Sequence, residues 1–277
     1  MNWKIIFSIA KKDITEARQN KSVWLPILIV PIFFILLIPL GMIIGLIVAG
    51  PDAVNFLNDP DLATFLEKMP PVMSQVLQGL DPVQDMLVLV LGYIFAPFFL
   101  IMPLMYSTVI ASESFAGEKE RKTVEALLYT PVSDTELFLG KVMASFLPAV
   151  AITWGCFLAY TVVLNTAGWP LMHSVWFPLT NWYPLILWVS PALSLLGIAV
   201  AVLISAKVQT FMGAYQSSAS LVVLVLGLLV GQITGVLYLS AVVGLILGLL
   251  IWIAGILLMV VAIRTFNREK LLLSSAA

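Results

Sequence analysis

Six long apolar runs dominate this chain, and none of them contains an Asp, Glu, Lys or Arg residue. The runs cover residues 23–49, 86–111, 142–166, 184–205, 211–235 and 239–263. An α-helix needs roughly 20 apolar residues to cross a hydrocarbon core of about 30 Å. The sequence therefore predicts an all-α polytopic membrane protein, with six transmembrane helices in a single domain over residues 1–277.

The basic residues predict how these helices are oriented. All but one of the 14 Lys and Arg residues lie in alternate connections: 1–22, 112–141, 206–210 and the segment after 263. The exception, Lys68, shares the segment 50–85 with six acidic residues. Because connections rich in Lys and Arg stay on the cytoplasmic side, we expect both termini to be cytoplasmic and 50–85 to be extracellular.

Composition argues against several classes of function. Proton- and ion-coupled pumps need titratable groups at membrane depth, and the six runs have none. The net charge of −1 gives no sign of nucleic-acid binding, and 61% hydrophobic residues are typical of a membrane protein. The only cysteine, Cys156, excludes an intrachain disulfide. The only histidine, His173, has no second ligand cluster nearby, so we expect no metal site.

The first 22 residues predict an amphipathic helix at the inner membrane surface. Residues 3–18 place apolar side chains at helical spacing and lysines on the other face. The apolar residues are Trp3, Ile6, Phe7, Ala10, Ile14 and Ala17. Two interpretations stay open, a plain juxtamembrane helix and an elbow helix that touches a cytoplasmic partner.

Proline and glycine positions predict how the spans bend and pack. Prolines at 26, 31 and 39 in the first span and at 97 and 103 in the second predict bent helices. The fifth and sixth spans have no proline and are predicted to be straight. They carry the glycines Gly227, Gly231, Gly235, Gly244 and Gly248. This spacing predicts close packing within one hairpin, Gly231 against Gly244 and Gly227 against Gly248, with a dimer seam as the alternative.

The connection 112–141 carries the most specific pattern in the chain. Interleaved charges and an apolar strip predict a surface helix over 118–129, which ends at Thr130-Pro131. Ser133 or Asp134 is then the predicted N-cap of the helix that leads into the third span. A short charged helix with one apolar side fits a groove in a soluble partner.

This connection resembles the first cytoplasmic loop of the permease subunits of ABC-2 type transporters. That loop reads E-x-E-(R/K)-x-T-x-E-x-L-L-x-x-P-(V/I)-S, followed by E-L-x-x-G-K. The matching residues here are Glu118, Glu120, Arg121, Thr123, Glu125, Leu127, Leu128, Pro131, Val132, Ser133, Glu136, Leu137, Gly140 and Lys141. The chain departs from the pattern at Lys122, where the family usually has Gly. The link 205–216 is similar to a weaker second segment of the family.

The resemblance implies a non-catalytic export permease in a prokaryotic plasma membrane, surrounded by lipids and paired with a second permease copy as a homodimer or heterodimer. ATP and Mg would bind a separate nucleotide-binding ATPase subunit, since this chain has no G-x-x-x-x-G-K-(S/T) phosphate loop. The residues implied to couple to that subunit are Glu118, Lys119, Glu120, Arg121, Thr123, Glu125, Leu127, Leu128 and Pro131.

The resemblance also implies a pathway along the second and fifth spans. Its lining residues would be Phe95, Phe98, Met102, Met105, Tyr106, Met212, Gln216 and Ser220. The alternative is that these residues are ordinary contacts between helices. The substrate stays open among lipids, amphiphilic drugs, peptides and ions.

Two other classes of function compete with a permease. A membrane-embedded enzyme would need carboxylates, paired histidines or a metal inside the spans, and the sequence supplies none of these. A membrane scaffold that transports nothing would account for the packing glycines but not for the charged connection 112–141.

Overall fold

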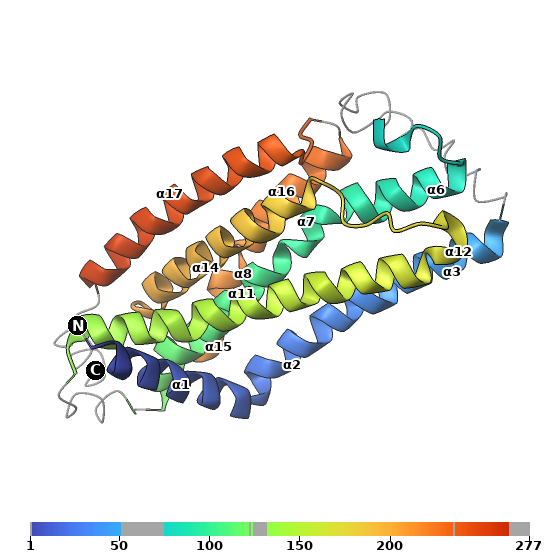
Figure 1. Ribbon diagram of the computed structural model, residues 1–277. Helices are drawn as coiled ribbons and strands as arrows, with labels where there is room; N and C mark the ends of the chain where they lie inside the picture. Colours follow the sequence, from blue (N-terminus) through green and yellow to red (C-terminus); the bar gives the residue numbers. More distant parts are fainter. Residues whose placement is uncertain (1, 51–74, 122, 124–131, 235, 266–277) are drawn as a thin grey trace.

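The computed structural model describes residues 2–50, 75–121, 123, 132–234 and 236–265, and Figure 1 shows their course. All regular structure in these residues is helical. The elements, with η marking a 3-10 or π-helix, are α1 (Trp3–Gln19), α2 (Lys21–Pro31), η1 (Ile32–Leu37), α3 (Ile38–Ala49), η3 (Gln75–Leu77), α6 (Pro82–Leu87), η4 (Val88–Ile94), α7 (Ala96–Phe99), α8 (Ile101–Ser112), η5 (Glu113–Gly117), α9 (Glu118–Glu120), α11 (Asp134–Ala167), α12 (Trp169–Met172), α13 (Trp182–Pro184), η6 (Leu185–Val189), α14 (Ser190–Ser205), α15 (Phe211–Ala219), α16 (Val222–Ile233) and α17 (Ala241–Thr265).

Six helices are long and apolar enough to cross a membrane, which confirms the predicted fold class. They run over Lys21–Ala49, Pro82–Glu120, Asp134–Ala167, Trp182–Ser205, Phe211–Ile233 and Ala241–Arg264. Each overlaps one of the six apolar runs, and we number them as the first to the sixth span.

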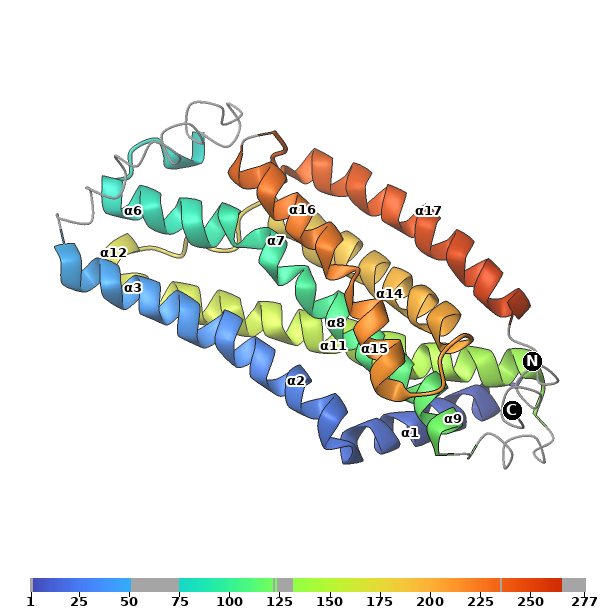
Figure 2. The same cartoon turned by 180° about the vertical axis from the view of Figure 1, so that it is seen from behind.

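The second and fourth spans form the centre of the bundle. Most residues of each are buried, whereas most residues of the other four spans are partly buried or exposed. α14 of the fourth span packs against α8 of the second and α17 of the sixth, and α8 also packs against α11 (Figure 2). The outer spans carry exposed apolar side chains, as helices surrounded by lipid would.

The predicted N-terminal helix is present as α1, and it packs against α11. It begins after Asn2, whose side chain accepts a hydrogen bond from the Lys4 N–H. Ile6 and Ala10 are buried, whereas Trp3 and Phe7 are half exposed. A Cβ at Gly140 of α11 would lie 3.2 Å from the Ile6 carbonyl oxygen and 2.8 Å from Ile9 Cβ. A glycine at this position therefore lets the two helices approach closely.

Prolines interrupt the α-helical pattern of the spans. π-helical segments follow Pro31 as η1, precede Pro97 as η4 and follow Pro184 as η6. Proline lacks the N–H that closes an α-helical turn, and π-bulges are one of the ways in which a helix adjusts. The second span is also interrupted at Phe95 and Leu100, on either side of α7.

Three successive carbonyl groups in the second span accept hydrogen bonds from side chains of three other spans. The Phe95 N–H bonds to Val90 O at 2.8 Å, in the π-helical register, and Pro97 has no N–H to offer the carbonyl of residue 93. The side-chain donors are Tyr160 Oη to Leu91 O at 2.9 Å, Trp182 Nε1 to Gly92 O at 2.7 Å and Gln232 Nε2 to Tyr93 O at 2.6 Å. We call Leu91 O, Gly92 O and Tyr93 O the carbonyl triplet. Unpaired carbonyls are costly in an apolar interior, so these donors stabilise the interrupted helix.

The prediction of a straight fifth span is wrong. α15 ends at Ala219, and α16 begins only at Val222. The Leu221 N–H reaches Ser218 O at 3.1 Å, and Ser220 Oγ donates to Ser217 O at 2.7 Å. Serine hydroxyls that compete for helix carbonyls bend helices, so a run of serines interrupts this span without a proline.

The predicted glycine pairing between the fifth and sixth spans is also wrong. A Cβ at Gly244 would meet Pro184 at 3.3 Å, and one at Gly248 would meet the Trp188 ring at 2.2 Å. These glycines therefore pack against the fourth span. A Cβ at Gly227 would meet nothing within 4 Å, and one at Gly231 would meet Leu237 at 3.4 Å. Gly235 lies outside the described residues.

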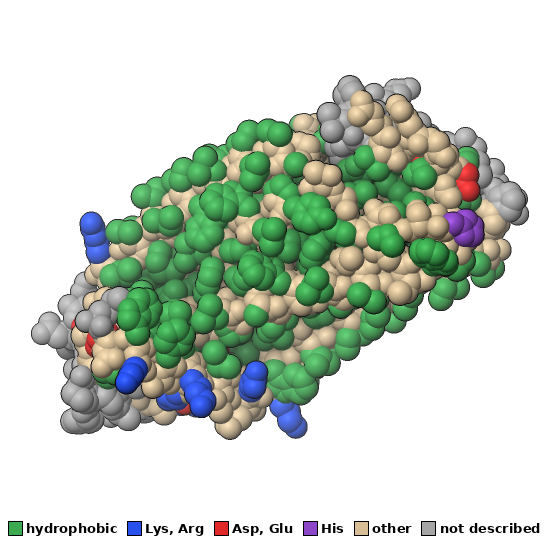
Figure 3. Space-filling view, viewed as in Figure 1, with side chains coloured by type: hydrophobic (Ala, Val, Ile, Leu, Met, Phe, Trp, Pro, Cys, Tyr) green, Lys and Arg blue, Asp and Glu red, His purple; other side chains and the backbone are tan. Residues whose placement is uncertain are grey.

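The bundle has one basic end. α1, α9 and the last turn of α17 lie at this end (Figure 2). The Lys and Arg side chains visible in Figure 3 gather at this end, the apolar side chains cover the middle, and the histidine lies toward the other end. We call these two ends the basic end and the opposite end.

Candidate functional site

The second span does not stop where its apolar run ends. It continues as helix through η5 and α9 to Glu120. α11 begins at Asp134, and Ser133 is its N-cap, with a capping box completed by Glu136. Most of the predicted connection 112–141 is therefore helix that belongs to the second and third spans.

The predicted surface helix over 118–129 is described only at its start. Its helical part ends at Glu120, and the Thr123 N–H bonds back to Glu118 O at 3.0 Å. The implied coupling residues Glu125, Leu127, Leu128 and Pro131 lie outside the described residues.

One of the described coupling residues, Glu118, joins a buried ionic network at the basic end. Lys141 Nζ lies 2.6 Å from Glu118 Oε2 and 3.3 Å from Asp13 Oδ2. Its ammonium also donates to Ser114 O at 2.6 Å, so each of its three protons has an acceptor. Lys141, Glu118 and Asp13 are at most 4% exposed. One lysine of the third span thus ties the second span to α1.

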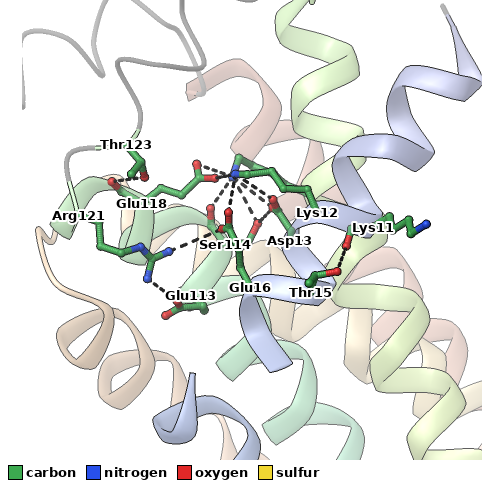
Figure 4. Close-up of polar contacts among 11 residues, drawn as sticks. Lys11, Lys12, Asp13, Thr15, Glu16, Glu113, Ser114, Glu118, Arg121 and Thr123 are labelled. Atoms are coloured by element: carbon green, nitrogen blue, oxygen red, sulfur yellow. Dashed lines mark hydrogen bonds and ion pairs between the residues drawn. The ribbon is translucent and has the colours of Figure 1, made fainter. Parts of the chain in front are cut away.

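A second lysine completes the charge balance of this network. Lys12 Nζ lies 2.9 Å from Glu118 Oε1 and 3.2 Å from Glu16 Oε1, and Ser114 Oγ donates to Asp13 Oδ2. Figure 4 shows the side chains of Asp13, Ser114 and Glu118 converging. We call Lys12, Asp13, Ser114, Glu118 and Lys141 the basic-end network.

Two lysines occupy a carboxylate cluster at the basic end. Carboxylate oxygens of Asp13, Glu16 and Glu118 lie within 4.8 Å of one another, a spacing that could hold a cation. The ammonium groups of Lys12 and Lys141 already lie beside these oxygens. A divalent ion would have to displace them.

A separate ion pair connects the end of the second span to itself and to α1. Arg121 Nη1 lies 2.5 Å from Glu113 Oε1, and Arg121 Nη2 lies 4.0 Å from Glu16 Oε2. Burial lowers the pKa of Arg121, but the Glu113 carboxylate, with Glu16 and Glu118, raises it above its ordinary value. Arg121 therefore stays charged, with its guanidinium turned back toward the protein.

Lys119 and Glu120 hold the link between the fourth and fifth spans. Lys119 Nζ donates to Ser205 O, the last residue of α14, at 2.5 Å. The Phe211 N–H, at the start of α15, donates to Glu120 Oε2 at 2.8 Å. A cation at a helix C-terminus and an anion at a helix N-terminus are both stabilising. These adjacent residues fix the ends of the link 206–210.

The predicted pathway residues of the second span face other helices of the same chain. Met102 and Tyr106 are fully buried, and Phe95 is stacked on Tyr160 with ring centres 5.7 Å apart. Phe98 and Met105 are partly buried. Within one chain these five residues are contacts between helices, as the packing alternative describes.

The predicted pathway residues of the fifth span lie on the surface of the chain. Met212, Gln216 and Ser220 are all exposed. The Ser220 hydroxyl bonds to Ser217 O within the helix, but the exposed amide of Gln216 in an apolar span needs water or another polypeptide beside it. The environment of this amide is therefore set by something outside the single chain.

Sequence reasoning missed Asp13, Glu113 and Ser114. A signal for Asp13 was available, because the buried stripe of α1 runs through Ile6, Ala10, Asp13 and Ala17 at steps of three and four. A carboxylate on the apolar stripe of an amphipathic helix requires a buried partner. No comparable pattern marks Glu113 or Ser114, which become buried only because the helix continues past residue 111.

The family of the chain follows from a comparison with family models. The model of the ABC-2 family transporter protein matches residues 7–272. The chain belongs to the ABC-2 transporter family. Among curated proteins, a search found none that matches. As an ABC-2 transporter protein with six helices that could cross a membrane, the chain is a multi-pass membrane component of a transporter.

Proposed function

We propose that this chain is the permease of an ATP-driven exporter, and that its basic end faces the cytoplasm. The family match over residues 7–272 carries the proposal. The concentration of Lys and Arg in the connections at the basic end supports the orientation. ATP and Mg would be bound by a separate ATPase subunit, because the sequence has no phosphate loop.

The proposed docking site for the ATPase is the connection 121–133, at the basic end. Glu113, Ser114 and Glu118 are used inside the chain, and so are the charged groups of Lys119, Glu120 and Arg121. The residues left for docking are those from 124 to 131, which keep the implied coupling roles of Glu125, Leu127, Leu128 and Pro131. A movement of this connection would then be transmitted through the basic-end network to α1 and the third span.

The pathway is proposed to run past the fifth span of each of two permease copies. Gln216 and Ser220 support this, since their exposed polar groups suit an aqueous vestibule. Single cysteines at Met212, Gln216 and Ser220 should react with a small aqueous thiol reagent, and ATP should change the rate. Equal protection at all three positions with and without ATP would contradict the pathway.

Coupling to the ATPase is tested by two charge reversals with different expected effects. Glu125→Lys should abolish stimulation of the ATPase while leaving thermal stability unchanged. Glu120→Lys should lower stability, because it places a cation beside the N-terminus of α15. If Glu125→Lys retains full ATPase stimulation and transport, docking at this connection is wrong.

Energy supply is tested in proteoliposomes that contain the permease and its ATPase. Transport should require ATP and should change little when pH and voltage gradients are collapsed, because a voltage acts only on charges that move through it. Substrates from the lipid, amphiphilic-drug, peptide and ion classes would be compared in parallel. Uptake driven by a proton or sodium gradient without the ATPase would overturn the proposal.

A further inference from the structure

An apolar cavity lies where α1 meets the start of the first span. Its volume is about 470 Å³, within the range of about 300–1,000 Å³ that is typical of small-molecule sites. The walls come from α1, α2, α8 and α11, with Ile14, Ile27, Leu147 and Ile152 among the lining residues. It lies apart from both the basic-end network and the exposed stripe of the fifth span.

One wall of the cavity follows α11. The lining residues on that helix extend from Ala144 to Ile152, which is about 12 Å at 1.5 Å per residue. α11 is one of the six helices that could cross a membrane, so this wall follows the direction of lipid chains. Leu147 and Trp24 are each about two-fifths exposed, so the cavity opens toward the lipid-facing surface.

One charge accompanies these apolar walls. Arg18 is the only charged side chain among the described residues that line the cavity. It is exposed, and within the described part of the chain it makes no ion pair. Trp24 lines the same cavity, and tryptophan is enriched at the level of lipid headgroups. An unpaired cation therefore sits where an acyl chain would leave the cavity and meet its phosphate.

We propose that this cavity is a binding site for an anionic phospholipid of the leaflet at the basic end. One acyl chain fills the apolar groove along α11, and the phosphate pairs with Arg18. Two observations favour this occupant. The charge of Arg18 is complementary to that of a phosphate, and Arg18 lies near the end of α1. The site is independent of the transport pathway, and it fixes α1 against the first and third spans through a lipid rather than through side chains alone.

The test uses the purified full-length chain and a phosphatidylglycerol with a photoreactive group on one acyl chain. Cross-linked peptides are mapped by mass spectrometry, with phosphatidylcholine of the same chains as the comparison lipid. We expect cross-links in residues 14–27 and 144–152, and stronger labelling by phosphatidylglycerol. Removing one basic residue near a membrane surface weakens anionic-lipid binding about fivefold, so Arg18→Gln should lower labelling by that factor.

Matched variants separate this site from general membrane contact. Lys11→Gln removes an exposed charge from the same helix outside the cavity and should leave labelling unchanged. Ala151→Phe fills the cavity from an exposed position, whereas Val162→Phe adds bulk to α11 outside it. Only Ala151→Phe should lower labelling by both lipids, with unchanged elution in size exclusion.

Three results would overturn the proposal. One is equal labelling by both lipids in the wild type together with no effect of Arg18→Gln. Another is labelling that survives Ala151→Phe. The third is a dimer that Ala151→Phe dissociates while lipid labelling stays constant, because the cavity would then belong to an interface with a second copy.

Discussion

The basic-end network and the carbonyl triplet both attach the second span to its neighbours, but by different chemistry. At the basic end, whole charges meet: Lys141 and Lys12 balance Glu118 and Asp13. At the triplet, neutral donors from Tyr160, Trp182 and Gln232 meet backbone oxygens. An unpaired ion costs far more in an apolar interior than an unpaired amide. Ionic contacts therefore suit the edge of the bundle, and neutral ones suit its middle.

The comparison predicts that stability falls most when a buried charge is removed. Lys141→Met should destabilise the chain by about 3 kcal/mol, because it leaves Asp13 and Glu118 buried with only Lys12 beside them. Lys207→Met, at an exposed lysine, is the control. Thermal unfolding in detergent measures both variants. Equal stability of the two variants would mean that water reaches the network and screens it.

A neutral donor at the triplet should matter less than a charge. Gln232→Leu leaves Tyr93 O without its side-chain donor and should cost about 1–3 kcal/mol. Gln216→Leu, an exposed glutamine on the same span, should change stability by less than about 0.5 kcal/mol. The same unfolding assay compares them. If Gln232→Leu costs more than Lys141→Met, the ranking of charges above neutral donors fails.

Contacts between charged side chains and helix ends should contribute less to stability than the neutral donors of the carbonyl triplet. Lys119→Met and Glu120→Gln each remove a charge from one end of the link 206–210 and should cost about 0.3–1 kcal/mol at low salt. The exposed Lys11→Met is the control. A loss from Glu120→Gln larger than about 2 kcal/mol would exceed a helix-end effect.

The smallest expected effect concerns Lys12, which is partly exposed. Burial lowers the pKa of Lys12, but the Glu118 carboxylate, with Asp13 and Glu16, raises it above its ordinary value. A raised pKa contributes stability below the unfolded value of about 10.4 and loses it only as pH rises through the folded value. The stability difference between wild type and Lys12→Gln should therefore be constant between about pH 6 and 9.

Salt gives an independent measure of the Lys12 contribution. Because part of this side chain meets solvent, the difference from Lys12→Gln should shrink between about 0.05 and 0.5 M salt. The difference for Gln232→Leu involves no charge and should stay the same. If the stability difference between wild type and Lys12→Gln does not change with salt, the charge of Lys12 is shielded from solvent.

Hydropathy and charge were enough to predict the six spans and the N-terminal helix, but not that this helix packs on α11 with Asp13 on its buried side. They were not enough to place the ends of the spans. The second span continues past residue 111 because Glu113 and Glu118 find Arg121 and Lys141 as partners, and a hydropathy pattern cannot register a partner. Serines rather than a proline interrupted the fifth span, and glycine spacing did not identify the facing helix.

The motif that resembles the family groups residues that lie at one end of the bundle, but it did not predict their contacts. Glu118, Glu120, Arg121 and Lys141 form one region, as a shared motif implies. The charges on 118–121 nevertheless turn toward the chain rather than toward a partner. The spacing of a linear motif holds no information about which distant helices surround it.

The pairing of Asp13 with Lys141 bears on the order in which the chain is assembled. The two residues lie 128 positions apart, so a ribosome finishes α1 and two complete spans before the lysine exists. Until then the Asp13 carboxylate has only the partly exposed Lys12 as a counter-ion, and α1 contacts the second span through Ser114 and Glu118. The third span adds Lys141, the buried counter-ion of both Asp13 and Glu118, and packs along α1. The first helix to be made thus completes its ionic contacts only after the third span is present.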